Sequence, residues 1–259
     1  MFNKKLKFAC FIHVRTHSSR LPGKPLKLIN GKRAVEHLIE RIKLAKRADL
    51  IVMCTTDQPQ DDVLEMIAKR HKIECFRGSA DDVLVRWLGA VEKFGIDYFV
   101  QIDGGDDLFT DPEIVDMFIK QMKKVPVDFM KAPDGFVCGG SPGGCISAVA
   151  LKKVCEIKNT EDTHDWIPYF TKTKYFKVKE LVIKDKIFFN DNVRLTMDYL
   201  DDLRFFRSVF KDLNIQKNSL PLRSILKRLS IKPELAKINL FRQQDYLVNR
   251  EKFIGPQVK

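Results

Sequence analysis

The chain has 259 residues, a formal net charge of +12 at pH 7, 44% hydrophobic residues and 31% charged residues. This balance supports one large α/β domain, or one domain with an appendage, and argues against intrinsic disorder. No apolar run approaches the roughly 20 residues that span a bilayer, and the spread-out Lys and Arg residues match no nucleic-acid-binding motif.

Short apolar runs alternate with segments of helical periodicity through the first half of the chain. The first run follows lysines, as in a signal peptide, but Arg15 and His17 end it and no small-residue cleavage site follows. We therefore predict a first strand and a cytoplasmic protein. The expected strands are Phe8–Val14, Leu50–Cys54, Ile73–Phe76 and Tyr98–Ile102. The expected helices are Arg33–Arg47, Gln60–His71, Ser79–Phe94 and one that begins with Asp111 as N-cap and Pro112 as its first residue.

This order of elements predicts a mostly parallel sheet with helices on both faces. In such folds a ligand binds at the carboxyl ends of the strands, so polar residues directly after each strand are candidate site residues. The six cysteines form no CxxC pair and no zinc-ligand spacing, and we interpret them as core thiols of a reducing compartment.

The pattern loosens in the second half of the chain. A Gly-rich stretch is followed by candidate strands and a helix, which are Gly135–Gly144, Cys145–Leu151, Tyr175–Ile183, Arg194–Met197 and Asp201–Phe210. The last forty or so residues carry apolar side chains at helical spacing among basic ones. We therefore predict a first domain over residues 1–215 and a basic helical C-terminal extension over residues 216–259.

The loop after the first strand combines cations, hydroxyls and a tight Pro-Gly turn. Its candidate ligand-binding residues are Arg15, Ser18, Ser19, Arg20 and Lys24. Cations and free backbone N–H groups at the carboxyl end of a strand suit a polyphosphate. The loop is neither a P-loop nor a GxGxxG motif, because both glycine patterns are absent. A basic surface loop is the alternative interpretation.

An acidic turn, Asp103–Asp107, follows the fourth strand. Carboxylates crowded in one turn repel one another unless a cation neutralises them, and hard oxygen ligands suit Mg²⁺. Asp198 follows the candidate strand Arg194–Met197 and completes a metal site with Asp106 if the sheet brings the two together. The alternatives are a polar turn before the Asp111 helix and a helix-capping role for Asp198.

Five segments resemble the cytidylyltransferases that activate acidic sugars, such as 3-deoxy-manno-octulosonate cytidylyltransferase. The resemblance is greatest to the spore coat polysaccharide biosynthesis branch of that family. The segments are RTHSSRLPGKPL (Arg15–Leu26), CTTDQPQDD (Cys54–Asp62), FRGSADDVLVRW (Phe76–Trp87), GGDDLFTDPEIVD (Gly104–Asp116) and RLTMDYLDDL (Arg194–Leu203). The resemblance covers most of the chain. It implies a Rossmann-like nucleotidyltransferase fold, a homodimer, and a role in cell-surface polysaccharide precursor synthesis.

The resemblance also implies residue roles. Arg15 and Lys24, helped by Ser18, Ser19 and Arg20, would hold the phosphates of CTP, and Asp106 and Asp198 would bind Mg²⁺. Arg77 and Ser79 would meet the base and ribose, in a pocket that Thr55 and Thr56 also line. Arg15, Lys24 and Asp106 are therefore the expected catalytic residues. A helix cap and a surface ion pair are the alternatives for Ser79 and Arg77.

The departures from the family pattern lie on the acceptor side. Asp107-Leu108 replaces the family's Cys-Pro, a Gly-rich stretch replaces its Asp-Val-Glu segment, and Thr163–Trp166 replaces its acidic-His segment. His164 is the one histidine that we consider for the acceptor site. The acceptor itself, expected to be a sugar acid or another anion, cannot be identified from these residues.

The function predicted from the sequence is CTP-dependent transfer of CMP to an anionic acceptor, with release of pyrophosphate. A glycosyltransferase of related fold is one alternative, in which Asp103–Asp107 would act as an Asp-x-Asp-type motif for a nucleotide sugar. A non-catalytic basic binding protein is the other.

Overall fold

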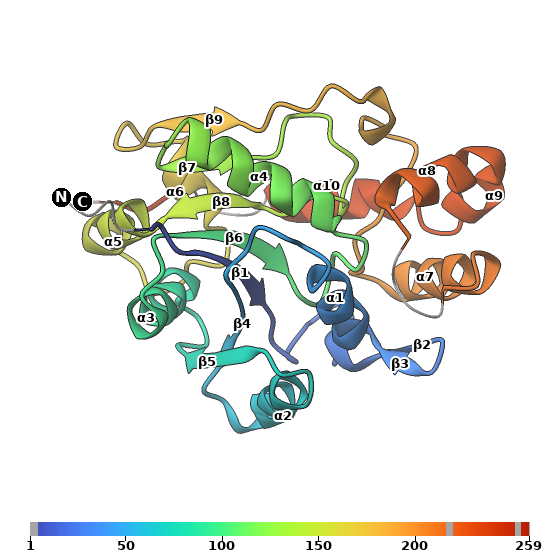
Figure 1. Cartoon of the computed structure of the whole chain (residues 1–259). Coiled ribbons are helices and arrows are strands. Elements are labelled where there is room, and N and C mark those ends of the chain that lie inside the picture. Colours follow the sequence, from blue (N-terminus) through green and yellow to red (C-terminus); the bar gives the residue numbers. More distant parts are fainter. Residues whose placement is uncertain (1–4, 216–219, 252–254, 259) are drawn as a thin grey trace.

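A twisted sheet of seven strands forms the centre of the computed structural model, which describes residues 5–215, 220–251 and 255–258 (Figure 1). In spatial order the strands are β5 (Glu74–Gly78), β4 (Leu50–Thr56), β1 (Phe8–His13), β6 (Tyr98–Asp103), β8 (Gly144–Ser147), β7 (Phe129–Lys131) and β9 (Val178–Glu180). β1 pairs in parallel with β4 and β6, and β4 pairs in parallel with β5. β8 is antiparallel to both β6 and β7. The predicted mostly parallel sheet is confirmed.

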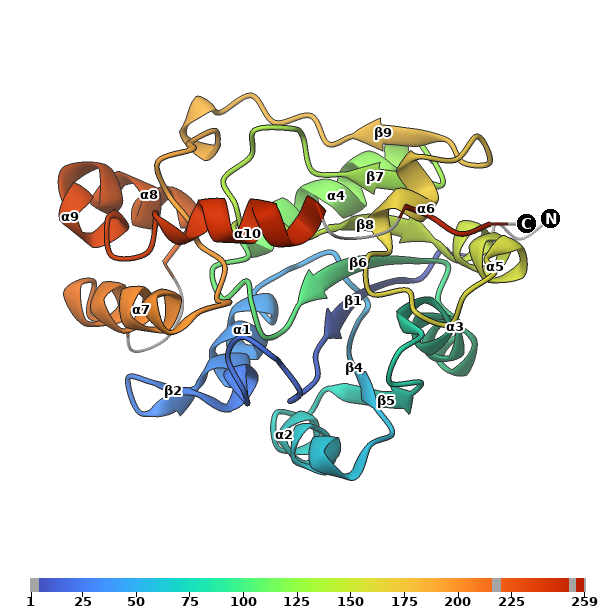
Figure 2. The ribbon, with the colours of Figure 1, turned by 180° about the vertical axis from the view of Figure 1, so that it is seen from behind.

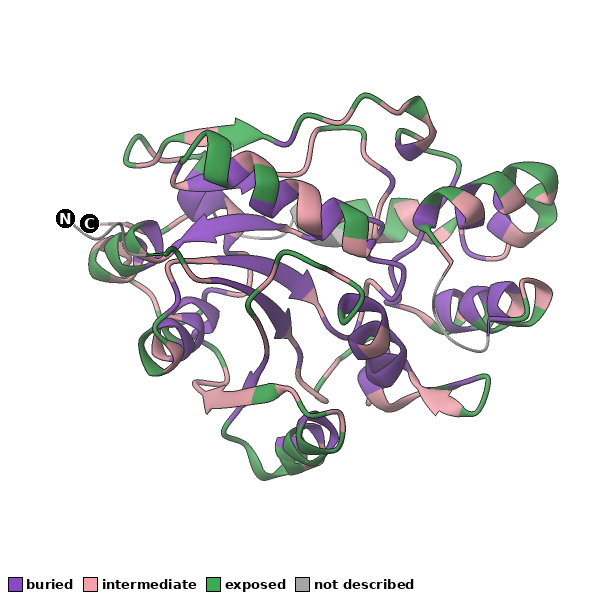
Figure 3. Cartoon of the chain, in the orientation of Figure 1, coloured by how far each residue is buried: buried purple, intermediate pink, exposed green. Residues whose placement is uncertain are grey.

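Helices cover both faces of this sheet, because successive side chains of a strand point to opposite faces. Phe8, Cys10 and Ile12 of β1 belong to one buried apolar cluster, and Ala9 and Phe11 belong to another. The helices of the first cluster are α1 (Ala34–Ile42), α2 (Asp62–Arg70), α4 (Pro112–Lys124), α7 (Leu200–Asp212), α8 (Leu222–Ile231) and α9 (Pro233–Ala236). Those of the second are α3 (Val83–Phe94), α5 (Ala148–Ile157) and α6 (Ile167–Thr171). In Figure 3, helices that cover the sheet, such as α4, carry buried residues on one side and exposed residues on the other.

Smaller elements connect this framework. They are the 3-10 helices η1 (Lys24–Leu26), η2 (Pro59–Asp61) and η3 (Lys186–Phe188), the hairpin strands β2 (Leu28–Ile29) and β3 (Lys32–Arg33), and the last helix α10 (Arg242–Glu251). α4 lies in front of the sheet in Figure 1, whereas α10 comes to the front when the molecule is turned in Figure 2. No helix in the described part of the chain combines the length and the apolar character that crossing a bilayer requires.

The expected helix Arg33–Arg47 ends at Ile42, and the expected strand Tyr175–Ile183 is limited to Val178–Glu180. Three further predicted elements differ from the structure. Residues Arg194–Met197 form no strand, because only Arg194 makes a bridge, to Cys138. The run Cys145–Leu151 changes from β8 to α5 at Ser147, whose hydroxyl accepts a hydrogen bond from the Ala150 amide and caps the helix. The expected Ser79 helix starts later, at Val83.

The late start of α3 has a local cause. The Asp82 carboxylate caps the helix by accepting from the Val85 amide, while the Ser79 hydroxyl accepts from the Asp82 amide one turn earlier. The serine therefore shapes the approach to the helix and does not cap it.

The predicted C-terminal extension packs against the rest of the chain. Leu222, Ile225 and Leu229 of α8, the residues expected on its apolar face, are buried in the first cluster. The Arg228 guanidinium donates to the Asp212 carboxylate at the end of α7 over 2.7 Å. The predicted domain boundary borders residues 216–219, which lie outside the described residues, and the division into two domains stays a prediction.

Candidate active site

A cavity of about 380 Å³ lies where β1 and β6 end at their carboxyl ends. Its lining residues come from the loop after β1, the acidic turn after β6 and the loop before α6. They are His13, Val14, Arg15, His17, Ser18, Ser19, Arg20, Lys24, Asp103, Gly105, Asp106, Asp162 and His164. All five residues predicted to hold phosphate are therefore on the wall of one cavity, together with Asp106.

The loop after β1 is held in place by its neighbours. The Asp61 carboxylate accepts hydrogen bonds from the Thr16 amide over 2.8 Å and from the Thr16 hydroxyl over 2.6 Å. Gly23, whose φ of +65° favours glycine, donates its amide to the Thr16 carbonyl and starts η1. The turn fixes the backbone at Lys24, so that its side chain reaches back toward the end of β6.

The Lys24 ammonium joins two carboxylates that are distant in the sequence. Its Nζ lies 2.6 Å from Oδ1 of Asp106 and 3.4 Å from Oδ1 of Asp198. Burial by itself would lower the pKa of Lys24, but Asp106 and Asp198 outweigh it and hold the pKa above its ordinary value. The Met197 amide donates to the Asp106 carbonyl, which ties the two segments together. The structure thus brings Asp106 and Asp198 to the same cation.

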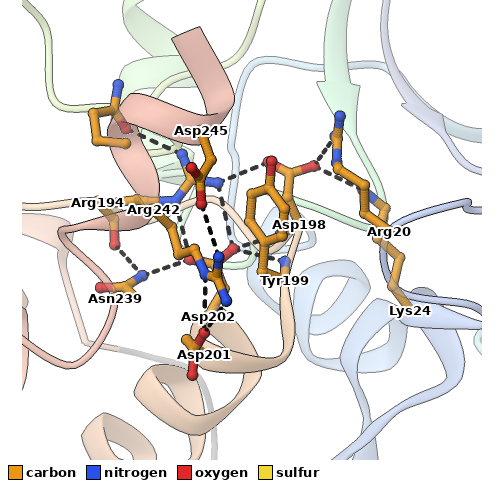
Figure 4. A network of polar contacts seen from close by, with 11 residues as sticks. Arg20, Lys24, Arg194, Asp198, Tyr199, Asp201, Asp202, Asn239, Arg242 and Asp245 are labelled. Carbon is orange, nitrogen blue, oxygen red and sulfur yellow. Dashed lines mark hydrogen bonds and ion pairs between the residues drawn. The ribbon is translucent and has the colours of Figure 1, made fainter. Parts of the chain in front are cut away.

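Asp198 is enclosed by three cations. Figure 4 shows Arg20 and Lys24 on one side of its carboxylate and Arg194 on the other. The Arg194 guanidinium donates to Oδ2 over 2.9 Å, and Arg20 donates to Oδ1. Burial would raise the pKa of Asp198, but Lys24, Arg20 and Arg194 together lower it below its ordinary value. Asp198 is therefore an ionised, almost fully buried carboxylate.

The carboxyl groups of the acidic turn have raised pKa values, in contrast to Asp198. Burial, followed by the charge of Asp106, raises the pKa of Asp103 to about 7. Burial raises the pKa of Asp106 despite Lys24, and burial with the charges of Asp103 and Asp106 raises that of Asp107. The turn packs tightly because Gly104 has no side chain: a Cβ there would lie 2.8 Å from Cβ of Val14. Burial and mutual repulsion therefore favour the protonated forms of these carboxyl groups, whereas a cation bound beside them would favour the charged forms.

The donor set of Asp106 and Asp198 fits Mg²⁺. Two carboxylates already converge on one cationic atom, and Mg²⁺ is commonly held by one or two carboxylates with substrate phosphates and water as its other ligands. Among the residues that the structure describes, no group of three or more His, Cys, Asp or Glu side chains is placed to hold a metal without such help. A metal at this place would depend on phosphate oxygens.

The crowding predicts a pH dependence of stability. Because the pKa of Asp103 is about 7 in the folded chain, the folded state binds more protons than the unfolded state between about pH 4 and 7. We expect the free energy of unfolding of the metal-free protein to decrease over this interval by on the order of 4 kcal/mol. Urea unfolding with a chelator at several pH values measures it. Asp103→Asn should flatten the slope, and an unchanged slope in that variant would contradict the assignment.

Arg77 lies outside the cavity lining. Its guanidinium is 2.6 Å from Asp62 and 3.0 Å from Glu65 of α2, and it also donates to the Thr56 and Gln58 carbonyls. These contacts match the surface ion pair that was the alternative for this residue. Its expected role toward the nucleotide stays a prediction.

The other residues expected around the base also lie beside the cavity and not on its wall. The Thr56 hydroxyl donates to the Asp61 carboxylate, and the Thr55 hydroxyl is buried with no hydrogen-bond partner among the described residues. Ser79 borders the site through its neighbour, because Arg15 donates to the Ala80 carbonyl over 3.3 Å. The roles of Thr55, Thr56 and Ser79 toward the nucleotide stay predictions as well.

The structure adds residues that the sequence did not single out. His13 is the last residue of β1, in register with Asp103 of β6, and this position at a strand end was the available signal. Asp162 joins the cavity from the loop before α6, and no sequence pattern marked it. His164, considered for the acceptor site, lies on the cavity wall beside Asp162.

Comparisons with known proteins agree with this fold. A family model described as "Cytidylyltransferase" matches residues 9–252. The spore coat polysaccharide biosynthesis protein SpsF of Bacillus subtilis is 27% identical over 210 residues, which cover 77% of this chain and 85% of that protein.

Two solved structures share the fold. A cytidylyltransferase from Leptospira borgpetersenii superposes with a TM-score of 0.81 at 24% identity, over 89% of this chain and 97% of that one. A CMP:2-keto-3-deoxy-manno-octonic acid synthetase complexed with CTP superposes with a TM-score of 0.59 at 16% identity, over 80% of this chain and 99% of that one.

Proposed function

This chain belongs to the cytidylyltransferase family, a family of nucleotidyltransferases, and we propose that it transfers CMP from CTP to a sugar acid with release of pyrophosphate. The observation that carries the proposal is Lys24, whose ammonium is held between Asp106 and Asp198 on the wall of a cation-lined cavity. This arrangement suits a polyphosphate beside a divalent cation. Family membership also decides against the glycosyltransferase and the non-catalytic binding protein.

The chain's own residues would act by positioning and by charge. Arg15, Arg20 and Lys24 would bind the phosphates, with the hydroxyls of Ser18 and Ser19 as neutral hydrogen-bonding groups on the same wall. These cations would stabilise the negative charge that develops on the departing pyrophosphate. The site would hold the α-phosphate in line with the acceptor oxygen. This alignment lowers the entropic cost of bringing the two reacting groups together.

Asp106 and Asp198 would hold Mg²⁺, which when bound would neutralise phosphate charge and polarise the phosphoryl oxygens. A phosphate entering the site would give Lys24 a new partner, because its ammonium has several donors to share. Asp198 would stay fixed during this exchange, since the buried Arg194 guanidinium contacts its other carboxylate oxygen independently of Lys24.

A sugar acid is the acceptor class that we propose. One relative of similar fold is named for 2-keto-3-deoxy-manno-octonic acid, and SpsF is named for polysaccharide biosynthesis. A net charge of +12 attracts such anions. A homodimer in the cytoplasm, active in polysaccharide precursor synthesis, completes the proposal on the basis of the family resemblance.

Thermal unfolding with each of the four nucleoside triphosphates and Mg²⁺ tests the donor half. We expect CTP to raise the melting temperature most, because a ligand that binds only the folded state stabilises it. Lys24→Met should weaken apparent CTP affinity roughly 10- to 100-fold, since a charged hydrogen-bond donor is lost. Lys27→Met removes the same charge from η1's C-terminal end, outside the cavity lining, and is the matched control.

Pyrophosphate release tests the reaction itself. We expect release from CTP only when a sugar acid is present, measured with a panel that includes 2-keto-3-deoxy-manno-octonic acid. Equal stabilisation by all four triphosphates would contradict the choice of base. An unchanged CTP affinity in Lys24→Met would contradict the phosphate assignment, and a lost CTP effect in Arg77→Met would confirm the role expected for Arg77.

A further inference from the structure

Two of the three histidines that line the cavity come from distant parts of the chain: His13 ends β1, and His164 lies in the loop before α6. Each imidazole has one ring nitrogen engaged by a neighbour. The two neighbours have opposite character, because one is a guanidinium and the other is a carboxylate. The hydrogen bonds therefore assign opposite roles to the nitrogens that remain.

His13 is held as a neutral hydrogen-bond donor. The Arg86 guanidinium donates to Nδ1 of His13 over 3.0 Å, and a guanidinium has no acceptor atom. Nδ1 must therefore carry the lone pair, and the ring proton sits on Nε2. Burial, and then the charges of Arg86 and Arg15, lower the pKa of His13 well below its ordinary value. His13 has no free lone pair with which to accept a proton.

The contact of His164 indicates the opposite tautomer. Its Nδ1 lies 2.8 Å from Oδ1 of Asp162, and the hydrogen bond from His164 is the largest of the effects that lower the pKa of Asp162. A deprotonated carboxylate only accepts, so Nδ1 carries the proton and Nε2 carries the lone pair. That Nε2 is buried and has no hydrogen-bond partner among the described residues. A buried acceptor without a partner is costly, which points to a donor supplied by a ligand.

We propose that the Asp162–His164 pair is the general base of the reaction, an inference that rests on the proposed function. Nε2 of His164 accepts the proton of the acceptor hydroxyl as its oxygen forms the bond to the α-phosphorus of CTP. The bond from that phosphorus to the bridging oxygen breaks, and its electron pair leaves with pyrophosphate. Asp162 stabilises the imidazolium, which later releases the proton to water.

The charged groups near the Asp162–His164 pair come from two parts of the chain. Asp162, from the same loop, favours the imidazolium, while His13 and Arg15 approach from β1 and the loop after it. Arg15 also lowers the pKa of Asp162, which helps to keep this carboxylate ionised as the partner of His164.

Variants of the two histidines form a matched pair for the test, with kcat for pyrophosphate release measured against pH. We expect wild-type kcat to rise with pH, because a general base acts only in its unprotonated form. His164→Gln should lower kcat about 100-fold and abolish this rise, while CTP still raises the melting temperature as in the wild type. His13→Gln should keep the increase of kcat with pH, independently of the absolute value of its kcat. Asp162→Asn should lower kcat about tenfold.

The outcomes separate the two levels of the proposal. If the wild type releases no pyrophosphate from CTP with any sugar acid of the panel, the proposed function fails and the general base fails with it. If the wild type turns over and His164→Gln keeps both the rate and the pH dependence, only the general base is overturned. Nitrogen NMR gives an independent check, because a proton found on Nε2 of His164 and a lone pair on Nδ1 would also overturn it.

Discussion

Asp106→Asn should reduce cytidylyl transfer about 1000-fold while the protein stays folded. Asp106 lies on the cavity wall, with its carboxylate 2.6 Å from the Lys24 ammonium. An amide removes the negative charge that would hold a divalent cation against the phosphates. The same change relieves the crowded turn, whose pKa values are raised by burial and mutual repulsion. We therefore expect a melting temperature no lower than that of the wild type.

Asp107→Asn is the matched control for this prediction. Asp107 belongs to the same turn and is subject to the same crowding, but it does not line the cavity. Its substitution should leave most of the activity intact. Pyrophosphate release at saturating CTP and Mg²⁺ measures both variants, with a circular dichroism spectrum to confirm the fold. Equal losses in the two variants would mean that the turn acts only through its structure, and full activity in Asp106→Asn would remove it from the site.

Arg194→Met should lower the free energy of unfolding by about 3 to 5 kcal/mol. Arg194 is completely buried, and its guanidinium donates to Asp198 over 2.9 Å and to Asp202 over 3.0 Å. Without it, two buried carboxylates lose a charged partner in a place that water does not reach. The loss should also reduce activity, because Asp198 would no longer be held from its far side (Figure 4).

An exposed arginine provides the comparison. Arg204 pairs with Asp201 over 2.9 Å, also in α7, but its side chain is 63% exposed. Arg204→Met should cost less than about 1 kcal/mol, because water and salt screen a surface ion pair. Urea unfolding measures both variants. Adding Asp202→Asn to Arg194→Met should restore part of the lost stability, and similar losses in the two arginine variants would contradict the role given to the buried network.

The Arg194 network also explains how the C-terminal segments reach the site. The Asn239 amide donates to the Arg194 carbonyl over 3.1 Å and to the Asp202 carboxylate over 2.8 Å, and Gln243 of α10 accepts from the Arg194 guanidinium. The segment that the sequence predicts as a basic extension thus supports the back of Asp198. Its contribution is structural, because none of these residues lines the cavity.

Local patterns in the sequence were sufficient for the strands and helices of the first half and for the cation-rich loop that lines the cavity. The apolar run at Phe8–His13 predicts a strand that is buried on both faces, because such strands are apolar along most of their length. The structure shows this burial for β1. The residues Arg15–Lys24 are contiguous, so a single turn brings them to one place. The helix starting at Pro112 carries its own cap at Asp111.

Tertiary structure alone decided the contacts between distant segments. Asp198 meets Asp106 through the Lys24 ammonium and not through neighbouring strands, because residues Arg194–Met197 form no strand. Arg77 pairs with Asp62 and Glu65 of α2. These contacts depend on where α2 packs relative to β5, which the sequence does not show. The opposite roles of His13 and His164 are likewise invisible in the sequence. These roles depend on the hydrogen-bond partner of each imidazole, Arg86 for His13 and Asp162 for His164. Only folding brings Arg86 to His13, because the two are far apart in the sequence.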